Sequence, residues 1–214
     1  MRTRTMTGTA MAMVGVALML SGCDGVTGTS VGVGAPGSLE GLASEALQAD
    51  LPYLRQEEKL ARDVYRTLGE SWGTPAMANI ANSEQTHTDL VRDLLAALVI
   101  PDPVLDDTVG VLAEPALAAL YADLVATGRT SEVEALRVGA TIEDLDIADL
   151  RAMAARTDLP EALAVYSALE CGSRNHLRSY VALLVAADAT WAPTHLTQAE
   201  VDAIVGSPRE KCGA

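Results

Sequence analysis

The chain has 214 residues, a formal net charge of −14 at pH 7 and no phenylalanine. Nucleic-acid binding needs clustered lysine and arginine, so this acidic balance argues against a nucleic-acid partner, whereas it favours solubility and attracts cations. Alanine and leucine dominate and only 3% of the residues are aromatic, a composition that favours close-packed helices over a sheet.

The N-terminus carries the pattern of an export signal. Arg2 and Arg4 precede an apolar run over residues 10–20 that is too short to span a bilayer. The run ends in Leu20-Ser21-Gly22-Cys23, which resembles the bacterial lipoprotein signal, in which the cysteine is acylated and becomes the first residue of the mature chain. The resemblance implies lipidation of Cys23 and a membrane partner. The protein would then be exported and anchored to the cell envelope, on the outer face of the cytoplasmic membrane or the periplasmic side. The alternative is a secreted protein in which Cys23 is incidental.

We predict four segments along the chain. Residues 1–22 are the signal peptide, and residues 23–45 are the lipidated cysteine and a flexible tether rich in Gly, Thr and Ser. Residues 46–206 form one helical domain that is long enough for a sizeable core. Residues 207–214 form a C-terminal tail.

Helical periodicity predicts the first elements of the domain. Apolar residues recur at helical spacing over residues 51–70, which indicates an amphipathic helix. Thr74 caps a second helix and Pro75 takes its first position, which proline favours; this helix runs to about Leu98. A short helix is predicted over residues 115–126.

Capping-box spacing opens the helices predicted over residues 131–144 and 197–205. Residues 146–156 form a short helix or a kinked continuation, and a fourth long helix is predicted over residues 158–189. No segment alternates with period two for long enough to be a strand. The sequence therefore predicts an all-α fold, an up-and-down four-helix bundle with short additional helices and a longer crossover between the second and third principal helices.

Two cysteines remain besides Cys23, namely Cys171 and Cys212. Outside the cytoplasm such a pair can oxidise to a disulfide. Because sequence spacing says nothing about distance in space, whether these two cysteines pair stays open.

Glu84 and His87 are the first candidates for chemistry. Three residues apart on a predicted helix, they lie on one face, one turn from each other. A carboxylate and an imidazole at that spacing can bind the same metal ion, and carboxylate-bridged dinuclear bundles use this unit. Taken alone, the pair also fits two solvated side chains.

The other long helices each offer a similar group toward the predicted core. Glu58 shares an apolar stripe of the first helix, Glu143 lies near the apolar face of the third, and His176 lies on the stripe of the fourth. A carboxylate inside a core needs a partner or a metal. Each residue alone also fits a side chain at the edge of the core, or a core histidine bonded to a carbonyl. Together the four helices favour a metal site.

Several motifs resemble a known superfamily. Residues 58–65, followed by Ser83-Glu84-Gln85-Thr86-His87, resemble the first helix pair of the ferritin-like superfamily, which includes rubrerythrins and bacterioferritins. The whole span from about Ala46 to Ile204 is more similar to an uncharacterised ferritin-like group, domain of unknown function 2202. The stretches that carry this closer resemblance are residues 57–65, 79–85, 142–147 and 172–178.

The resemblance implies a ferritin-like bundle with an iron or manganese site of one or two ions. Carried over by position, Glu58 and His87 would bind one ion, Glu143 and His176 would bind the second, and Glu84 would bridge both.

One position departs from the pattern of the superfamily. The fourth helix usually carries a second Glu-x-x-His unit, but here Ser173 stands three residues before His176. A bridging carboxylate is therefore missing, and Glu57 or Glu170 would have to substitute through a water or a shifted ligand. Tyr65 is predicted near the site, either as a donor of a hydrogen bond or an electron or simply as part of the core.

The sequence thus predicts a lipid-anchored, metal-binding protein with an activity of ferrous iron oxidation or peroxide reduction. The alternative is a metal-free helical binding or envelope-structural module. The serine at position 173 favours the alternative, and the intact Glu84/His87 pair favours the metal.

Overall fold

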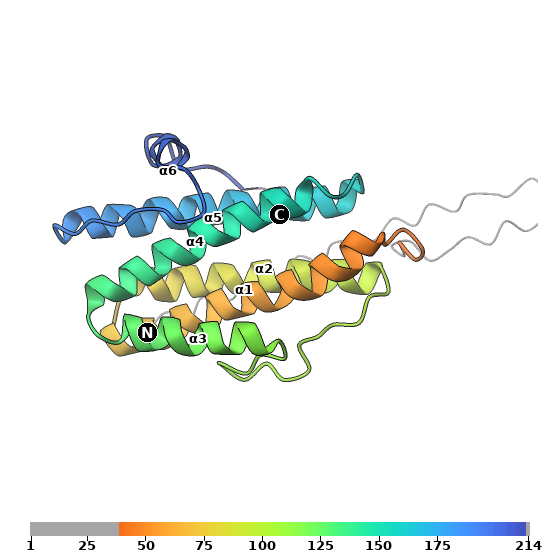
Figure 1. The fold of residues 1–214 in the computed structure, drawn as a ribbon, viewed down its shortest axis with the longest axis horizontal. Helices are drawn as coiled ribbons and strands as arrows, with labels where there is room; N and C mark the ends of the chain where they lie inside the picture. The colour runs from red at the N-terminus through yellow and green to blue at the C-terminus, as the bar shows by residue number, and fades with distance from the viewer. Residues whose placement is uncertain (1–38, 213–214) are drawn as a thin grey trace, which may run out of the picture. The chain divides into compact units, whose positions relative to one another are not determined.

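This computed structural model describes residues 39–212. Within these residues it contains six α-helices and no strands (Figure 1). The predicted signal and Cys23 lie outside these residues. The helices are α1 (Glu45–Trp72), α2 (Pro75–Ala97), α3 (Pro115–Gly128), α4 (Glu132–Ala154), α5 (Pro160–Ala186) and α6 (Gln198–Val205). The predicted all-α helical bundle is confirmed. None of the described helices has the length and apolar content that a membrane crossing requires.

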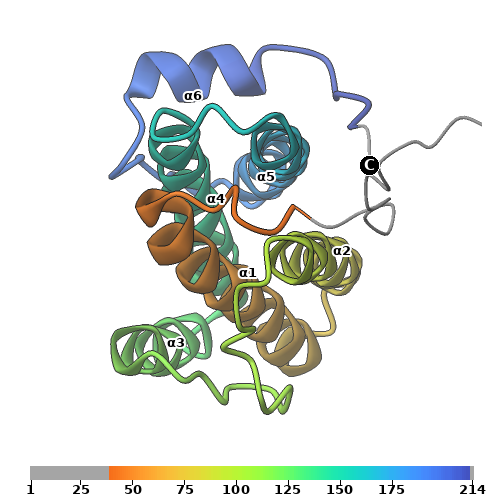
Figure 2. The same ribbon diagram turned by 90° about the vertical axis from the view of Figure 1, so that its right-hand side faces the viewer.

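The four long helices form two antiparallel pairs, α1 with α2 and α4 with α5 (Figures 1 and 2). Asp50 near the start of α1 bonds to Arg156 just after α4, and Tyr65 near the end of α1 contacts Gly139 near the start of α4. Helices α1 and α4 are therefore antiparallel to each other. It follows that α2 and α4 run in the same direction, and the crossover between them returns along the bundle. Helix α3, within this crossover, packs on α1 and α4, and α6 packs on α5.

Two helix boundaries differ from those that the sequence periodicity predicts. Helix α1 begins at Glu45, six residues before the predicted start, because Ser44 caps it and Leu47 is fully buried in the core. Pro52 lies inside the helix, where a proline cannot donate a backbone hydrogen bond. Helix α4 continues without interruption to Ala154, so of the two predicted alternatives for residues 146–156 the structure has a continuation and not a separate short helix.

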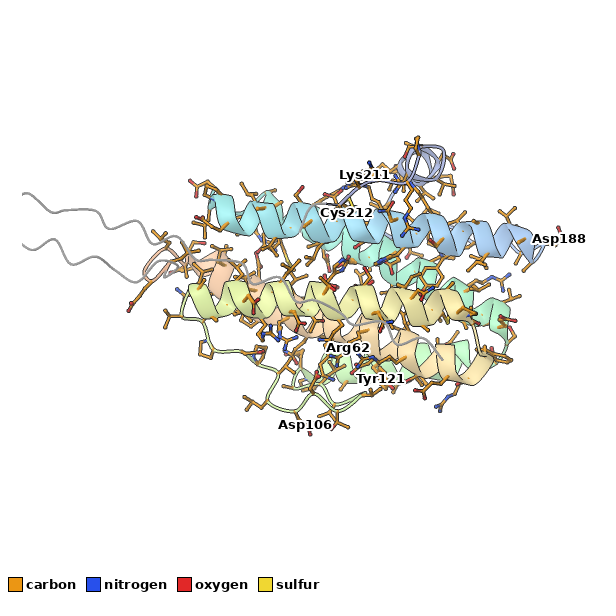
Figure 3. All side chains as sticks on the ribbon, turned by 180° about the vertical axis from the view of Figure 1, so that it is seen from behind. Arg62, Asp106, Tyr121, Asp188, Lys211 and Cys212 are labelled. Atoms are coloured by element: carbon orange, nitrogen blue, oxygen red, sulfur yellow. A yellow bond between two sulfur atoms is a disulfide. The ribbon has the colours of Figure 1, made fainter. Side chains whose placement is uncertain are left out.

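Charged side chains of α1 hold the crossover in place. The Arg62 guanidinium is fully buried and donates to the Asp107 carboxylate at 2.8 Å. Lys59 is equally buried and donates to Asp63 at 2.6 Å and to the carbonyl oxygen of Thr108 at 2.8 Å. Figure 3 labels Arg62 beside the crossover. These charges neutralise one another, so Lys59, Arg62 and Asp63 of α1 bind the crossover that connects the two helix pairs.

The C-terminal segment is fastened to α5. Cys171 and Cys212 form a disulfide, which resolves the pairing that the sequence left open (Figure 3). Glu210 accepts from Arg174 at 2.6 Å and from Arg178 at 2.8 Å. The segment after α6 therefore returns to the middle of α5.

The core consists of two apolar clusters with a polar layer between them. Along α5, Leu169 belongs to one cluster and Leu177 to the other, while the buried Ser173 and His176 lie between. Helices α1 and α2 show the same order, whereas on α4 the buried Glu143 lies between Ile142 and Ile147 of one cluster, and Leu150 of the other cluster follows. Because the apolar clusters exclude water above and below, the polar groups of this layer must satisfy one another or bind an ion.

Candidate metal centre

The structure brings all five predicted ligands together in this polar layer. Their side chains come from the four long helices, and each residue is at most 5% exposed. They form two groups of three whose ligand atoms lie within 4.8 Å of one another. The first trio is Glu58, Glu84 and His87; the second trio is Glu84, Glu143 and His176.

Glu84 belongs to both trios and divides its oxygens between them. Its Oε2 lies 2.7 Å from Nδ1 of His87, and its Oε1 lies 2.7 Å from Nδ1 of His176. Glu58 Oε2 lies 3.3 Å from the same atom of His87, and Glu143 Oε2 lies 3.5 Å from that of His176. The carboxylate of Glu84 therefore has the position of a bridge between two sites.

The contacts within the trios suit a shared ion better than hydrogen bonds. Although the distances are short, four buried atoms have no hydrogen-bond partner: Glu58 Oε1, Glu84 Oε1, His87 Nδ1 and His176 Nδ1. Bonds of about 2.0–2.2 Å to one ion separate its ligand atoms by up to about 4.4 Å, and the contacts of 2.7–3.5 Å between the glutamates and histidines lie within that range. Carboxylate and imidazole ligands suit iron and manganese.

The electrostatics centre on Glu84. Burial alone lowers the pKa of an imidazole, but Glu84 and Glu58 outweigh burial and raise the pKa of His87 well above its usual value. Burial also opposes the charged form of His176, yet Glu84 and Glu143 raise its pKa from 6.5 to about 9. Burial raises the pKa of Glu84, but the two imidazoles on either side outweigh it and lower that pKa. Without a metal, at neutral pH, the layer thus holds a charged Glu84 between two protonated histidines.

The outer carboxylates behave differently. Burial raises the pKa of Glu58 from 4.5 to about 7, although His87 opposes this shift. Burial likewise raises the pKa of Glu143, against the effect of His176. The raised pKa values of Glu58, Glu143 and the two histidines favour their protonated forms, so a metal ion and protons compete for these ligands.

Two residues fix the orientation of the ligands. A Cβ atom at Gly172 would lie 2.4 Å from Nε2 of His87, so the absence of a side chain on α5 makes room for this ring. Tyr65, fully buried, donates from its hydroxyl to Oε1 of Glu143 at 2.5 Å. The structure thus has Tyr65 beside the candidate centre, as the sequence predicts, bonded to one of its carboxylates.

The two auxiliary glutamates lie in different surroundings. Glu170 forms ion pairs with Arg151 at 2.9 Å and with Arg174 at 2.7 Å, outside both trios. Glu57 is buried and neither of its carboxylate oxygens has a hydrogen-bond partner. Burial, and then the charge of Asp149, raises the pKa of Glu57 well above its usual value.

Asp146 is a buried acid of the polar layer that the sequence pattern did not single out. Its Oδ2 contacts the hydroxyl of Ser173, and its Oδ1 has no hydrogen-bond partner. The available signal was its position three residues after Glu143, which places both acids on one face of α4.

A cavity of about 280 Å³ reaches the imidazole side of the layer. It lies against α2 and α5, and its lining includes His87 and His176. The C-terminal segment contributes Arg209, Glu210 and Cys212 to the same lining. Ions and small molecules can therefore approach the histidines from this face.

Comparisons with known proteins agree on one family. Residues 48–208 match the family described as "Uncharacterized protein domain (DUF2202)". The chain is 46% identical over 168 residues to the uncharacterized protein MJ0754 of Methanocaldococcus jannaschii, a match that covers 78% of this chain and 91% of that protein. The crystal structure of hypothetical protein MJ0754 from Methanococcus jannaschii superposes with a TM-score of 0.77 and 47% sequence identity, covering 78% of this chain and 95% of that chain. The family match includes both trios, and the chain belongs to the DUF2202 family.

Proposed function

We propose that the domain is a ferritin-like protein that binds two ions of iron or manganese, one at each trio, with Glu84 as the bridge. The observation that carries the proposal is that Glu84 directs one carboxylate oxygen toward each histidine. Glu58 and His87 would complete the first ion's ligands, and Glu143 and His176 the second's. The unpartnered ligand atoms support this assignment, because buried polar atoms without partners are unfavourable unless an ion binds them.

We further propose that the loaded protein oxidises ferrous iron or reduces peroxide. Iron or manganese at such a site supplies one-electron redox chemistry. The chain itself would supply the cavity on the histidine side, through which a small oxidant reaches the centre. The Tyr65 hydroxyl would hold Glu143 in place and keep a proton beside it.

Elemental analysis of the full chain, purified without added metal or chelator, tests the metal assignment. We expect about two equivalents of iron or manganese in the parent protein and a loss of both in Glu84→Ala, because this residue belongs to both trios. Glu170→Ala is the matched control, since it also removes a glutamate side chain, but from a position on α5 that lies outside both trios. If the protein bound no metal even after reconstitution with ferrous iron, the proposal would be wrong.

The second candidate function is a metal-free binding or envelope-structural module. The specific observation in its favour is Ser173, which stands where a second bridging glutamate would be expected. In that case chelation leaves the melting temperature unchanged, whereas a metal-loaded domain loses stability when its ion is removed.

We also propose that lipid on Cys23 anchors the domain to the bacterial cell envelope. The support is the sequence Leu20-Ser21-Gly22-Cys23 after an apolar run. The test is the distribution of the protein between membrane and soluble fractions. Cys23→Ser is expected to release the protein or leave its signal uncut, and unchanged fractionation with normal processing would contradict the proposal.

A further inference from the structure

The two halves of the candidate centre repeat one arrangement with one difference. In α1 and α2, Glu58 faces the unit Glu84-x-x-His87; in α4 and α5, Glu143 faces His176. Three residues before His176 stands Ser173, at the position that Glu84 holds in the first half. The second half therefore lacks a carboxylate on its second helix.

Asp146 places a carboxylate directly against this serine. It follows Glu143 by one turn on α4, and its Oδ2 contacts the hydroxyl of Ser173. The corresponding position on α1, three residues after Glu58, is Ala61. The acid and the small residue have thus exchanged helices between the two halves, so each half contributes one acid to the middle of the layer.

The free oxygen of Asp146 has no compensation within the described residues. The residue is 6% exposed, its Oδ1 has no hydrogen-bond partner, and within residues 39–212 no lysine or arginine lies at ion-pair distance from it. Burial, followed by the charges of Glu58, Glu57 and Glu143, raises its pKa well above the usual value. Asp146 is not a member of either trio, but Glu58 of the first trio and Glu143 of the second both contribute to this shift. A buried carboxylate in such surroundings calls for a cation.

We propose that Asp146 is a fourth carboxylate of the dinuclear centre, in place of the one missing from α5, and offers its Oδ1 to the metal ions while Ser173 positions it through Oδ2. The inference rests on the proposed function, because it names a further ligand of the same site. The carboxylate whose absence from α5 favours a metal-free module is then supplied by α4.

A titration of the full chain with Mn²⁺ tests this inference. Calorimetry measures the binding of the ions, and electron paramagnetic resonance measures the magnetic coupling between the bound ions. Asp146→Asn keeps the size of the side chain and removes its charge, so the variant should fold, which thermal unfolding without metal verifies. We expect the second ion to bind at least about tenfold more weakly and the coupling of the two ions to be lost. Asp149→Asn, one turn farther along α4, is the matched control and should bind both ions as the parent does.

A double-mutant comparison separates positioning by Ser173 from a general structural role. Ser173→Ala should lower the affinity for the second ion by a smaller factor than Asp146→Asn does. The double variant should bind the second ion no more weakly than Asp146→Asn alone. If the effects of the two substitutions were additive, Ser173 would not act through Asp146.

The outcomes also distinguish this inference from the function on which it rests. A parent protein that binds no Mn²⁺ overturns the proposed metal centre altogether. A parent protein that binds two ions, alongside an Asp146→Asn variant that binds both equally tightly with unchanged coupling, overturns only the role of Asp146.

Discussion

Gly172 is the position at which a single added methyl group perturbs the candidate centre most directly. In Gly172→Ala the new Cβ would lie 2.4 Å from Nε2 and 2.6 Å from Cε1 of His87. Unstrained contacts of carbon atoms lie near about 3.5 Å, so the ring must move by about 1 Å. The same Cβ would lie 3.8 Å from Cε1 of His176, which is an ordinary contact. The substitution therefore acts on the first trio and spares the second.

The size of the expected effect follows from how little a metal site tolerates displacement. Ligand distances in metal sites hold within about 0.2 Å, so a shift of about 1 Å removes His87 from its place in the first trio. We expect the ion of the first trio to bind about 10–100-fold more weakly, which is the range found when the orientation of a ligand is lost. That range corresponds to about 1.4–2.8 kcal/mol of binding free energy.

Titration with Mn²⁺ measures this loss, and an alanine substitution elsewhere controls for the added methyl group. In Gly69→Ala the Cβ would meet Cβ of Met77 at 3.2 Å, a milder close contact between helices outside both trios. In the absence of any clash, alanine in place of glycine would stabilise a helix by about 1 kcal/mol. A Gly172→Ala protein that binds both ions as tightly as the parent would refute the assignment of His87 as a ligand.

Further predictions concern the protonation of His176, the hydrogen bond between Tyr65 and Glu143, and the disulfide. Metal affinity should rise with pH until about 9, because the raised pKa of His176 keeps a proton on this ligand below that pH and the metal must displace it. Without metal the sign is opposite: the protonated form of His176 stabilises the fold fully below pH 6.5, and thermal unfolding should reveal a loss of this stability as the pH rises through about 9. Tyr65→Phe removes a buried hydrogen bond to Glu143 and should lower the free energy of unfolding by about 1–3 kcal/mol in denaturant titrations, whereas an unchanged midpoint would contradict the contact. Reducing the Cys171–Cys212 disulfide, which links residues 41 apart, should cost about 2–4 kcal/mol of stability, measured by melting with and without reductant; equal melting temperatures would contradict this.

The candidate ligands could be found from the sequence because helical spacing fixes which side chains share a face. Glu84 and His87 are three residues apart, and Glu58 and His176 lie on the apolar stripes of their helices. Periodicity alone therefore predicts that these groups point into the bundle. It does not predict that one carboxylate lies between two histidines, since that depends on how the helix pairs pack.

Helical spacing could have distinguished Glu170, which was predicted as an auxiliary ligand, from Asp146, which was not predicted. Glu170 and Arg174 are four residues apart, the separation of an ion pair on a helix, and the structure has them paired at 2.7 Å. Asp146 has the spacing of a ligand relative to Glu143, but the superfamily pattern directs attention to α5. Only the packing of α4 against α5 reveals that the acid stands opposite Ser173.

The course of the chain between the helix pairs depends on contacts that no local pattern contains. The crossover before α4 sets the direction of this helix. The buried Arg62 holds the crossover in place through Asp107, which lies 45 residues later in the chain. The early start of α1 depends on Leu47, which packs in an apolar cluster with residues of α2, α4 and α5. Both features are set by tertiary packing, which overrides local propensity.

The balance of charge around α1 bears on the choice between a metal centre and a metal-free module. On the side of the crossover, Lys59 and Arg62 neutralise their acidic partners, so that buried polar structure is complete without any ligand. In the layer between the apolar clusters, the three glutamates of the two trios meet two imidazoles, Asp146 contacts Ser173, and none of these four acids pairs with a lysine or arginine of the described residues. A buried layer of this kind would be more stable with apolar residues, so its acids are a disadvantage to a module that only packs. When no metal is bound, the two imidazoles favour the charged form of Glu84, whereas burial favours protons on Glu58, Glu143 and Asp146. Divalent ions would satisfy these acids better while using the unpartnered ligand atoms. The layer therefore favours the metal centre, and it implies that the pH dependence of stability reverses when the ions bind.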